Sequence, residues 1–353
     1  MVKKIMVLLM GLMLVIGLAA CSSNETGQSQ GQKEEVRELV IADEGGNARK
    51  AYTKSLYEAF EKEYNVKITP VNMDYGKFTA MIGAGETPEW DVVSVDADFV
   101  IRGGEKGLLE KLDYNIINTE KLLPGYASDY GLTFLLVPVS VAYNKDAFKS
   151  GKYPQNWADF WDTEEFPGSR AVWNYPTYTL EAALLADGVK PSELYPLDVD
   201  RAFKSLEKIK DDISVWWDTG AQNGQLLQTG EVAASVSYAS TPINLGREGA
   251  PVGFSYNQAV LAETAWAVAK GSANKDLAME FINFAIDSKR LAEVADIMPY
   301  PMTNPEYYDL VSEETKGYLP TPEETESFVK VDFNWWVENF DMVNERWQKF
   351  ILE

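Results

Sequence analysis

The sequence predicts an α/β protein with a largely parallel sheet and two domains. Short apolar runs, such as 39–42 and 90–95, alternate with stretches at helical spacing. This order is typical of parallel sheets, whose ligands bind beyond the carboxyl ends of the strands. The chain has 353 residues and is 46% hydrophobic. Because a single core seldom grows that large, two domains are expected.

The elements follow from periodicity and from the turn residues between them. In the first third of the chain we expect a strand at 39–42, a helix around 56–64, a strand at 66–71, a helix at 78–83 and a strand at 90–95. Further strands are predicted at 133–143, 171–173, 213–217, 232–238 and 265–268. Further helices are predicted at 156–161, 180–186, 199–209, from 218 to Gly230, at 277–286 and at 335–352. Proline within 133–143 predicts that this strand is not paired centrally at Pro138.

The first twenty residues predict export. Two lysines precede an apolar run at 6–18, which is shorter than the roughly 20 residues needed to cross a bilayer. The following Leu-Ala-Ala-Cys at 18–21 resembles the bacterial lipobox, which implies cleavage before Cys21 and lipidation of its thiol. The alternative is an ordinary signal peptide with an incidental cysteine. Cys21 is the single cysteine, so no disulfide can form within the chain.

Composition excludes several functions. A polar stretch at 22–35 predicts a flexible tether between the anchor and the folded part. The net charge of −22 opposes nucleic-acid binding and attracts cations, although it can also serve solubility alone. Histidine is absent, which removes the usual general base and the commonest zinc ligand. We therefore expect no enzyme, no cofactor and no metal site.

Several segments together resemble the extracellular solute-binding proteins of ABC importers, and most of all the spermidine/putrescine type. They are the lipobox, EAFEKEYNVKI at 58–68, WDVVSVDADFV at 90–100, WADFW at 157–161, GEVAASVSYAS at 230–240, AWAVAKGSANKDLAMEFINFAID at 265–287 and PYPMTN at 299–304. Each motif is weak alone, but their order spans essentially the whole mature chain.

The resemblance implies a periplasmic-binding-protein fold of type II, an α/β fold whose two lobes are joined by two crossing strands. The implied crossings lie near 134–141 and 260–268. The expected divisions are a signal peptide at 1–20, a lipidated cysteine and tether at 21–38, a first lobe at 39–137 plus 264–315, and a second lobe at 138–263 plus 316–353. A solute would bind between the lobes and close the hinge, and the closed form would dock on a membrane permease with a cytoplasmic ATPase.

Candidate binding residues of the first lobe are acidic. Glu44 lies in a loop after the first strand, where the alternative is a plain turn. Ser94, Asp96 and Asp98 alternate after the third strand and are expected on one side of an extended segment. Carboxylates at the carboxyl end of a strand suit an ammonium group, and solvated loop acids are the alternative reading.

Candidates of the second lobe are aromatic. The carboxylate pair that the polyamine type has in this lobe is replaced by Tyr175 and Tyr178, which predicts an aromatic wall of the binding site. Trp173 either belongs to this wall or packs in the core. Trp217 precedes a glycine turn and a helix start, where free amide N–H groups bind anions. One of Trp216 and Trp217 is expected in the core.

The remaining candidates rest on the resemblance. Tyr238 and Tyr300 occupy positions of ligand-contacting aromatics. The acid expected before the second crossing is shifted by one residue, to Glu263, so alternation turns its side chain the other way. Trp335 is a candidate from the terminal helix.

The predicted function is capture of a small organic cation, a polyamine or an amino-acid-like amine, by a monomer anchored to the outer face of the cell membrane. The alternative is the same fold binding ferric iron, an anion or a sugar, with the adjacent Tyr307 and Tyr308 as iron ligands. A sensor that presents the solute to a membrane receptor has the same sequence signature.

Overall fold

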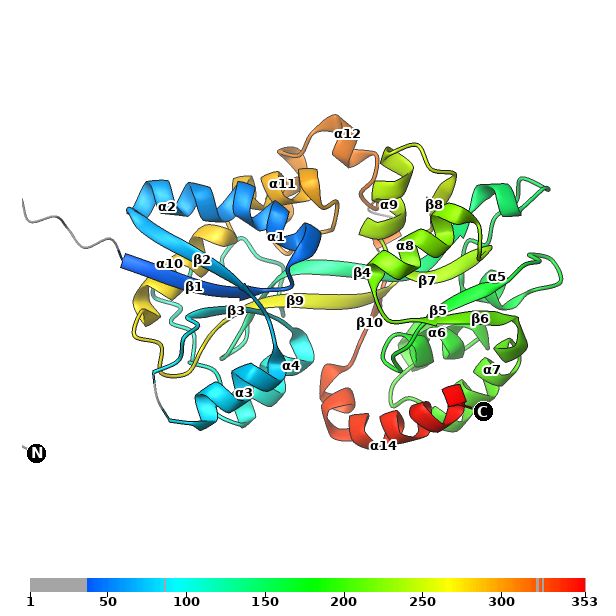
Figure 1. The fold of residues 1–353 in the computed structure, drawn as a ribbon, viewed down its shortest axis with the longest axis horizontal. Helices are drawn as coiled ribbons and strands as arrows, with labels where there is room; N and C mark the ends of the chain where they lie inside the picture. Colours follow the sequence, from blue (N-terminus) through cyan, green and yellow to red (C-terminus); the bar gives the residue numbers. More distant parts are fainter. Residues whose placement is uncertain (1–36, 86, 322–323, 326, 353) are drawn as a thin grey trace, which may run out of the picture. The chain divides into compact units, whose positions relative to one another are not determined.

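The computed structural model describes residues 37–85, 87–321, 324–325 and 327–352 (Figure 1). The predicted signal peptide, Cys21 and nearly all of the tether lie outside these residues. The first strand begins at Arg37, slightly before the predicted start at Leu39. Over the described ranges, no helix is long and apolar enough to span a membrane.

Two groups of parallel strands form the two ends of one sheet. Its order is β2-β1-β3-β9-β4-β7-β5-β6, with β10 paired to β9 and β8 paired to β4. At one end β1 is parallel to both β2 and β3, and at the other β5 is parallel to both β6 and β7. These strands are β1 (Arg37–Asp43), β2 (Val66–Asn72), β3 (Val92–Asp96), β5 (Arg170–Trp173), β6 (Ile213–Trp217), β7 (Ala234–Tyr238), β8 (Val252–Phe254) and β10 (Val329–Lys330).

Two long antiparallel strands connect the groups, β4 (Leu132–Asn144) and β9 (Val260–Val268). They pair with each other in the middle, while β9 pairs with β3 and β4 pairs with β7. We call β1–β3 with the helices packed on them the first lobe, and β5–β7 with theirs the second lobe. The predicted crossing strands are therefore present. The sheet is mixed because β9 runs antiparallel to β3, β4 runs antiparallel to β7, and the two crossings run antiparallel to each other.

Pro138 does not keep β4 at an edge, contrary to the prediction. It pairs with Leu261 of β9, while pairing with β7 begins at the next residue, Val139. Two residues earlier, the N–H of Leu136 donates to the carbonyl of Pro301 on the side that β7 later occupies. Pro138 thus lies between the segment of β4 that bonds to Pro301 and the segment that pairs with β7. Its missing N–H therefore costs no hydrogen bond of the sheet.

Helices cover both faces of each lobe (Figure 1). In the first lobe, alternate β3 side chains belong to two different cores: Val92 shares one with Leu56 and Phe60, and Val93 shares the other with Phe78. In the second lobe, alternation similarly separates Val172 from Ala171, which belong to different cores.

Helices of the first lobe are α1 (Gly46–Tyr52), a π-helical turn (Thr53–Tyr57), α2 (Glu58–Tyr64), α3 (Tyr75–Gly83), α4 (Ala97–Glu105), α10 (Lys275–Ala285) and α11 (Ser288–Ile297). Those of the second are α5 (Trp157–Trp161), α6 (Thr179–Ala186), α7 (Val199–Glu207), α8 (Gly220–Thr229), α9 (Ser240–Arg247) and α14 (Phe333–Leu352), while α12 (Glu313–Lys316) lies between the lobes in sequence.

Three helices that matter for the cleft were missed. α4 begins directly at the end of β3, α9 begins two residues after β7, and α11 follows α10 with only a short turn. Glycines at 103, 104 and 246 weaken the helical pattern of the first two. Burial of Phe99, Val100 and Ile243 shows that packing overrides this weak propensity.

Candidate ligand-binding cleft

A cleft of about 1300 Å³ lies against the crossing strands, at the carboxyl ends of the strands of both lobes. Leu135 and Val137 of β4 and Ala262 and Thr264 of β9 form its floor. The wall of the first lobe is rich in acids and the wall of the second is rich in aromatic rings. This is the place that the parallel strand order predicted for a ligand.

The loop after β1 presents Glu44 and anchors itself with Asp43. The buried Asp43 accepts hydrogen bonds from Tyr57 Oη at 2.7 Å and Arg49 Nε at 2.8 Å. Gly45 has a φ of +71°, and a Cβ there would lie 3.0 Å from Asn72 Oδ1. The turn therefore requires glycine, and it leaves Glu44 as the acid that faces the cleft.

Glu44 and Asp96 form an acidic pair of positions at the ends of neighbouring strands. Ser94 Oγ donates to Glu44 Oε1 at 2.6 Å, and Tyr75 Oη donates to Asp96 Oδ2 at 3.1 Å. Neither carboxylate has an ion pair with any described lysine or arginine. Ser94 is itself buried, so it orients Glu44 rather than lining the cleft.

Loss of hydration raises the pKa of both acids. Each keeps exposed surface in the cleft, but the surrounding protein atoms raise the pKa of Glu44 to about 7 and that of Asp96 to about 6. The hydrogen bond from Ser94 opposes the shift at Glu44, and repulsion from Asp98 adds to it at Asp96. A bound cation would favour the charged forms and reverse these shifts.

Asp98 reaches the cleft by a different route from the predicted one. β3 ends at Asp96, and Asp98 lies in the first turn of α4 instead of on an extended segment. Its Oδ2 accepts a hydrogen bond from Arg102 Nη2, one turn later, at 2.6 Å. The charge of Asp98 is thus matched within α4.

The second lobe contributes an aromatic wall. Trp173 stacks on Tyr178 with ring centroids 5.7 Å apart and meets Tyr238 edge to face at 5.4 Å. Tyr175 tilts against Trp173 at 4.9 Å. All four line the cleft, so Trp173 belongs to the wall as well as to the core behind it. Tyr178 has a φ of +68°, a costly conformation for a tyrosine that the wall holds in place.

The start of α8 supplies amide N–H groups. Thr219 caps the helix by accepting from the N–H of Gln222 at 3.2 Å. The N–H groups of Gly220 and Ala221, which line the cleft, meet no acceptor among the described residues. This is the helix start that the sequence indicated.

Comparison with known proteins identifies the class. Residues 55–321 match the family described as bacterial extracellular solute-binding protein. The chain belongs to this family. It is 33% identical over 317 residues to the gamma-aminobutyric acid-binding protein of Pseudomonas aeruginosa, covering 87% of this chain and 89% of the relative. It is 21% identical over 270 residues to the spermidine/putrescine-binding periplasmic protein of Escherichia coli, covering 73% and 76%. An ABC transporter substrate-binding protein from Bradyrhizobium japonicum superposes with a TM-score of 0.84 at 35% identity, covering 89% of this chain and 99% of that one.

The two-lobed periplasmic-binding-protein fold predicted from the sequence is therefore confirmed for this solute-binding protein. The predicted resemblance to the extracellular solute-binding proteins is confirmed as well. Family members and structural neighbours are binding proteins rather than enzymes.

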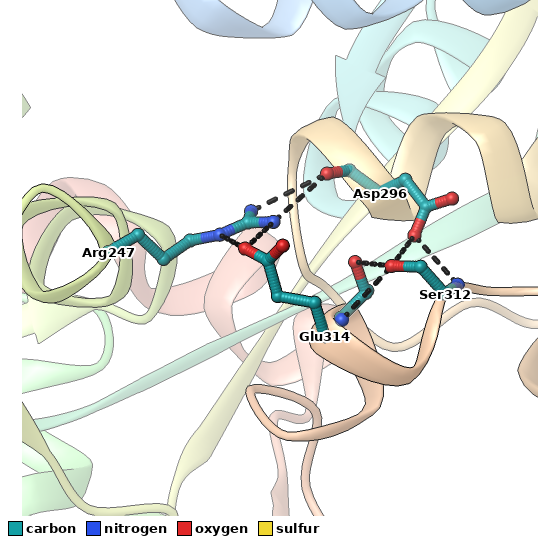
Figure 2. A network of polar contacts seen from close by, with 5 residues as sticks. Arg247, Asp296, Ser312 and Glu314 are labelled. Carbon is teal, nitrogen blue, oxygen red and sulfur yellow. Dashed lines mark hydrogen bonds and ion pairs between the residues drawn. The ribbon is translucent and has the colours of Figure 1, made fainter.

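In this solute-binding protein, both ends of α9 form polar contacts that connect the two walls of the cleft. At its start, Ser240 Oγ lies 2.5 Å from Tyr300 Oη. At its end, Arg247 donates to Glu314 Oε1 of α12 at 3.2 Å and to the carbonyl of Asp296 at the end of α11 at 3.4 Å, while the Asp296 carboxylate accepts from Ser312 (Figure 2). The cleft residues Thr241, Asn244 and Glu248 belong to this helix and its end.

The structure brings together seven of the predicted site residues. Glu44, Asp96, Asp98, Tyr175, Tyr178, Tyr238 and Tyr300 line the one cleft.

Four predicted residues lie elsewhere. Ser94 lies behind Glu44, and Trp217 is buried with Nε1 donating to the carbonyl of Val236 at 3.1 Å. Glu263 faces a second cavity of about 660 Å³ on the other side of the crossing strands, as alternation along β9 requires. In α14 it is Trp336 rather than Trp335 that lines the cleft, because the helix presents the next position to the core, where Trp336 Nε1 donates to the buried Glu181 at 2.6 Å.

Sequence reasoning missed Tyr52, Tyr75, Arg102 and Phe340, all of which line the cleft. An (i, i+4) pair of Asp98 and Arg102 was the available signal for α4 and its arginine. The others come from helices whose inward face only the packing decides.

The iron alternative finds no support in the geometry. Tyr307 is buried and Tyr308 exposed, and neither lines the cleft. Within the described chain, no group of three acidic, histidine or cysteine side chains is arranged to hold a metal.

Proposed function

We propose that this chain is the substrate-binding component of an ABC importer and that it captures a small organic cation, an amine or an amino-acid-like solute, for delivery to a membrane permease. One observation carries the proposal: Glu44 and Asp96 face an aromatic wall across a single cleft, and neither is paired with a cation of the described chain. An ammonium group would find charge on one side and π-faces on the other.

The energies suffice for useful affinity. A cation over an aromatic ring gains about 0.5–2 kcal/mol, and a charge-assisted hydrogen bond contributes roughly 1.5–3 kcal/mol. Micromolar binding needs about 8 kcal/mol. Two rings, one or two carboxylates and burial of the methylene groups of a solute reach this range.

The relatives support the same chemistry. One is named for gamma-aminobutyric acid and the other for spermidine and putrescine, and all three solutes carry a terminal ammonium group. The second lobe of this chain offers tyrosines, not a second carboxylate pair, which favours a solute with one ammonium end over a diamine.

The same proposal includes the anchor. Lipidation of Cys21 would hold the protein, as a monomer, at the outer face of the membrane, with the residues between Cys21 and the start of β1 at Arg37 as a tether. The proposal also keeps the two lobes at 39–137 plus 264–315 and at 138–263 plus 316–353. With these boundaries, β4 and β9 cross from one lobe to the other, where a hinge would act.

Native mass spectrometry of the purified protein tests the proposal most directly, because it detects any solute that stays bound in the closed cleft through purification. We expect an adduct with the mass of a small amine, and calorimetry with a panel of monoamines, diamines and amino acids should give heat for at least one. Absence of binding for every amine, together with binding of a sugar or of ferric iron, would refute the proposal.

A further inference from the structure

Arg102 stands out among the residues of the cleft. It is the single lysine or arginine among the described residues that line it, whereas Glu44, Asp96, Asp98 and Glu248 are the acids. A positively charged side chain on the wall of the cleft would repel a solute that carries only positive charge.

The side chain of Arg102 is held in place with donors to spare. Nη2 donates to Asp98 Oδ2 at 2.6 Å, and the guanidinium carbon lies 5.6 Å from the centroid of Phe99. A guanidinium has five N–H donors, and neither Nε nor Nη1 of Arg102 has a hydrogen-bond acceptor within the described ranges. The side chain is 41% exposed, so these donors remain accessible.

We propose that Arg102 receives an anionic group of the solute, so that the solute is a zwitterion with its ammonium group at Glu44 and Asp96 and its carboxylate at Arg102. This rests on the proposed function, which assigns the ammonium end. Asp98 balances the single charge of Arg102 through Nη2. In the part of the chain that the structure describes, the remaining N–H groups are left without an acceptor, and a second ammonium group would meet only donors there. A carboxylate there gains charge-assisted hydrogen bonds, which strengthen when closure excludes water.

Two aromatic side chains of the second lobe complete the surroundings. Tyr175 and Phe340 lie with ring centroids 5.4 Å apart and line the same cleft as Arg102. α14, which carries Phe340, packs on α4, which carries Arg102. The arginine therefore lies where the two lobes meet, and a solute that bridges Asp96 and Arg102 would touch both walls.

The start of α8 competes for the same carboxylate through the N–H groups of Gly220 and Ala221. Arg102 is favoured because the planar fork of a guanidinium matches a carboxylate and its hydrogen bonds are charge-assisted. A substitution at each location separates the two.

Calorimetry with three probes tests the assignment: 4-aminobutanoate, butylamine and 1,4-diaminobutane. In the full-length protein, Arg102→Gln should weaken 4-aminobutanoate about 10- to 100-fold. It should leave butylamine, which lacks the carboxylate, unchanged or tighter, because Asp98 is then unpaired. Retained butylamine binding also reports that the variant is folded. Lys106→Met removes a positive charge from the end of the same helix outside the cleft and should change none of the three affinities.

Three outcomes would overturn the inference while leaving the proposed function intact. One is that Arg102→Gln leaves 4-aminobutanoate unchanged, and another is that it weakens all three probes equally. The third is that Gly220→Pro, which removes an N–H at a position that tolerates proline, abolishes zwitterion binding while Arg102→Gln does not. Failure of the wild-type protein to bind these three probes and every other amine and amino acid of the panel would instead overturn the proposed function together with the inference.

Discussion

The hydroxyl groups of Tyr300 and Ser240 lie 2.5 Å apart, and they belong to opposite walls of the cleft. Tyr300 follows α11, which packs on α1 of the first lobe, whereas Ser240 begins α9, directly after β7 of the second lobe. Both residues line the cleft. A contact between the lobes therefore sits in the binding site itself, so closure and solute binding share it.

Tyr300→Phe removes this contact and keeps the ring. We expect amine affinity to fall about fivefold to tenfold, because one hydrogen bond contributes roughly 1 kcal/mol to the closed form. Calorimetry measures the affinity, and small-angle scattering of the unliganded protein should show a larger radius of gyration for the variant. Tyr307→Phe, outside the cleft, is the control. Equal affinity for both variants would mean that the contact plays no part in closure.

Arg247→Met removes the ties from α9 to α11 and α12 that Figure 2 shows. Glu314 is 69% exposed, so the ion pair stabilises by at most about 1 kcal/mol. We expect a loss of solute affinity of no more than about fivefold and a faster rate of solute release in stopped-flow fluorescence. Arg201 of α7 forms a comparable ion pair with Asp187, at the end of α6. Arg201→Met breaks this pair and should not alter the release rate. The same change in both variants would argue against a role for α9 as a tie.

Asp96→Asn and Glu44→Gln each remove one charge from the ammonium end of the cleft with little change of shape. We expect each to weaken amine binding at least tenfold, since each removes a charge-assisted hydrogen bond. Thermal unfolding of the unliganded variants should show equal or higher stability, because a partly desolvated charge is gone. Asp74→Asn, outside the cleft, serves as the control. Unchanged calorimetric affinity in both variants would remove the acids from the site.

Tyr238→Leu and Tyr238→Phe separate the aromatic face from the hydroxyl. The phenylalanine variant should bind amines nearly as the wild type does, because the ring supplies the attraction. The leucine variant should lose about 0.5–2 kcal/mol, roughly twofold to thirtyfold in affinity. Calorimetry with a single amine decides the matter, and an equal loss in both variants would indicate hydrogen bonding by the hydroxyl instead of a cation–π contact.

Solute affinity should depend on pH between 8 and 5. The pKa of Glu44 is raised to about 7 and that of Asp96 to about 6, so both acids take up protons as the pH falls through this range. Amine affinity should then drop by roughly tenfold or more for each pH unit below 6. The unliganded protein should show the opposite trend. Because both pKa values are raised in the folded state, these two groups destabilise the fold most at high pH, and this destabilisation is relieved as the pH falls toward 5.

The measurements are titration calorimetry and chemical unfolding across the same buffers. The chain has no histidine, so a transition near pH 6–7 reports carboxyl groups. A flat affinity profile would contradict the assignment of Glu44 and Asp96 to the ammonium end.

The sequence by itself determined the alternation of strands and helices, the crossing strands and the acids that end β1 and β3. The alternation and the acids follow from local patterns: apolar runs of strand length, turn residues such as Gly45, and loops at the carboxyl ends of parallel strands. The crossing strands were implied by the resemblance to the extracellular solute-binding proteins. For Glu263, strand periodicity combined with the one-residue shift from the family position predicted that the side chain turns the other way, and the structure places it at a second cavity.

Only the tertiary structure decided which residues meet across the cleft. Trp336 replaces Trp335, Asp98 is paired within a helix, and Pro138 lies in a central strand because its missing N–H falls between two neighbours. Tyr52 and Phe340 could not be placed from the sequence, since the rotation of each helix about its own axis is set by packing against residues far away in the chain. The (i, i+4) spacing of Asp98 and Arg102 indicates a helix, but not that Arg102 lines the cleft. A local pattern fixes what a segment becomes, whereas the burial of apolar surface against distant segments fixes which way it faces.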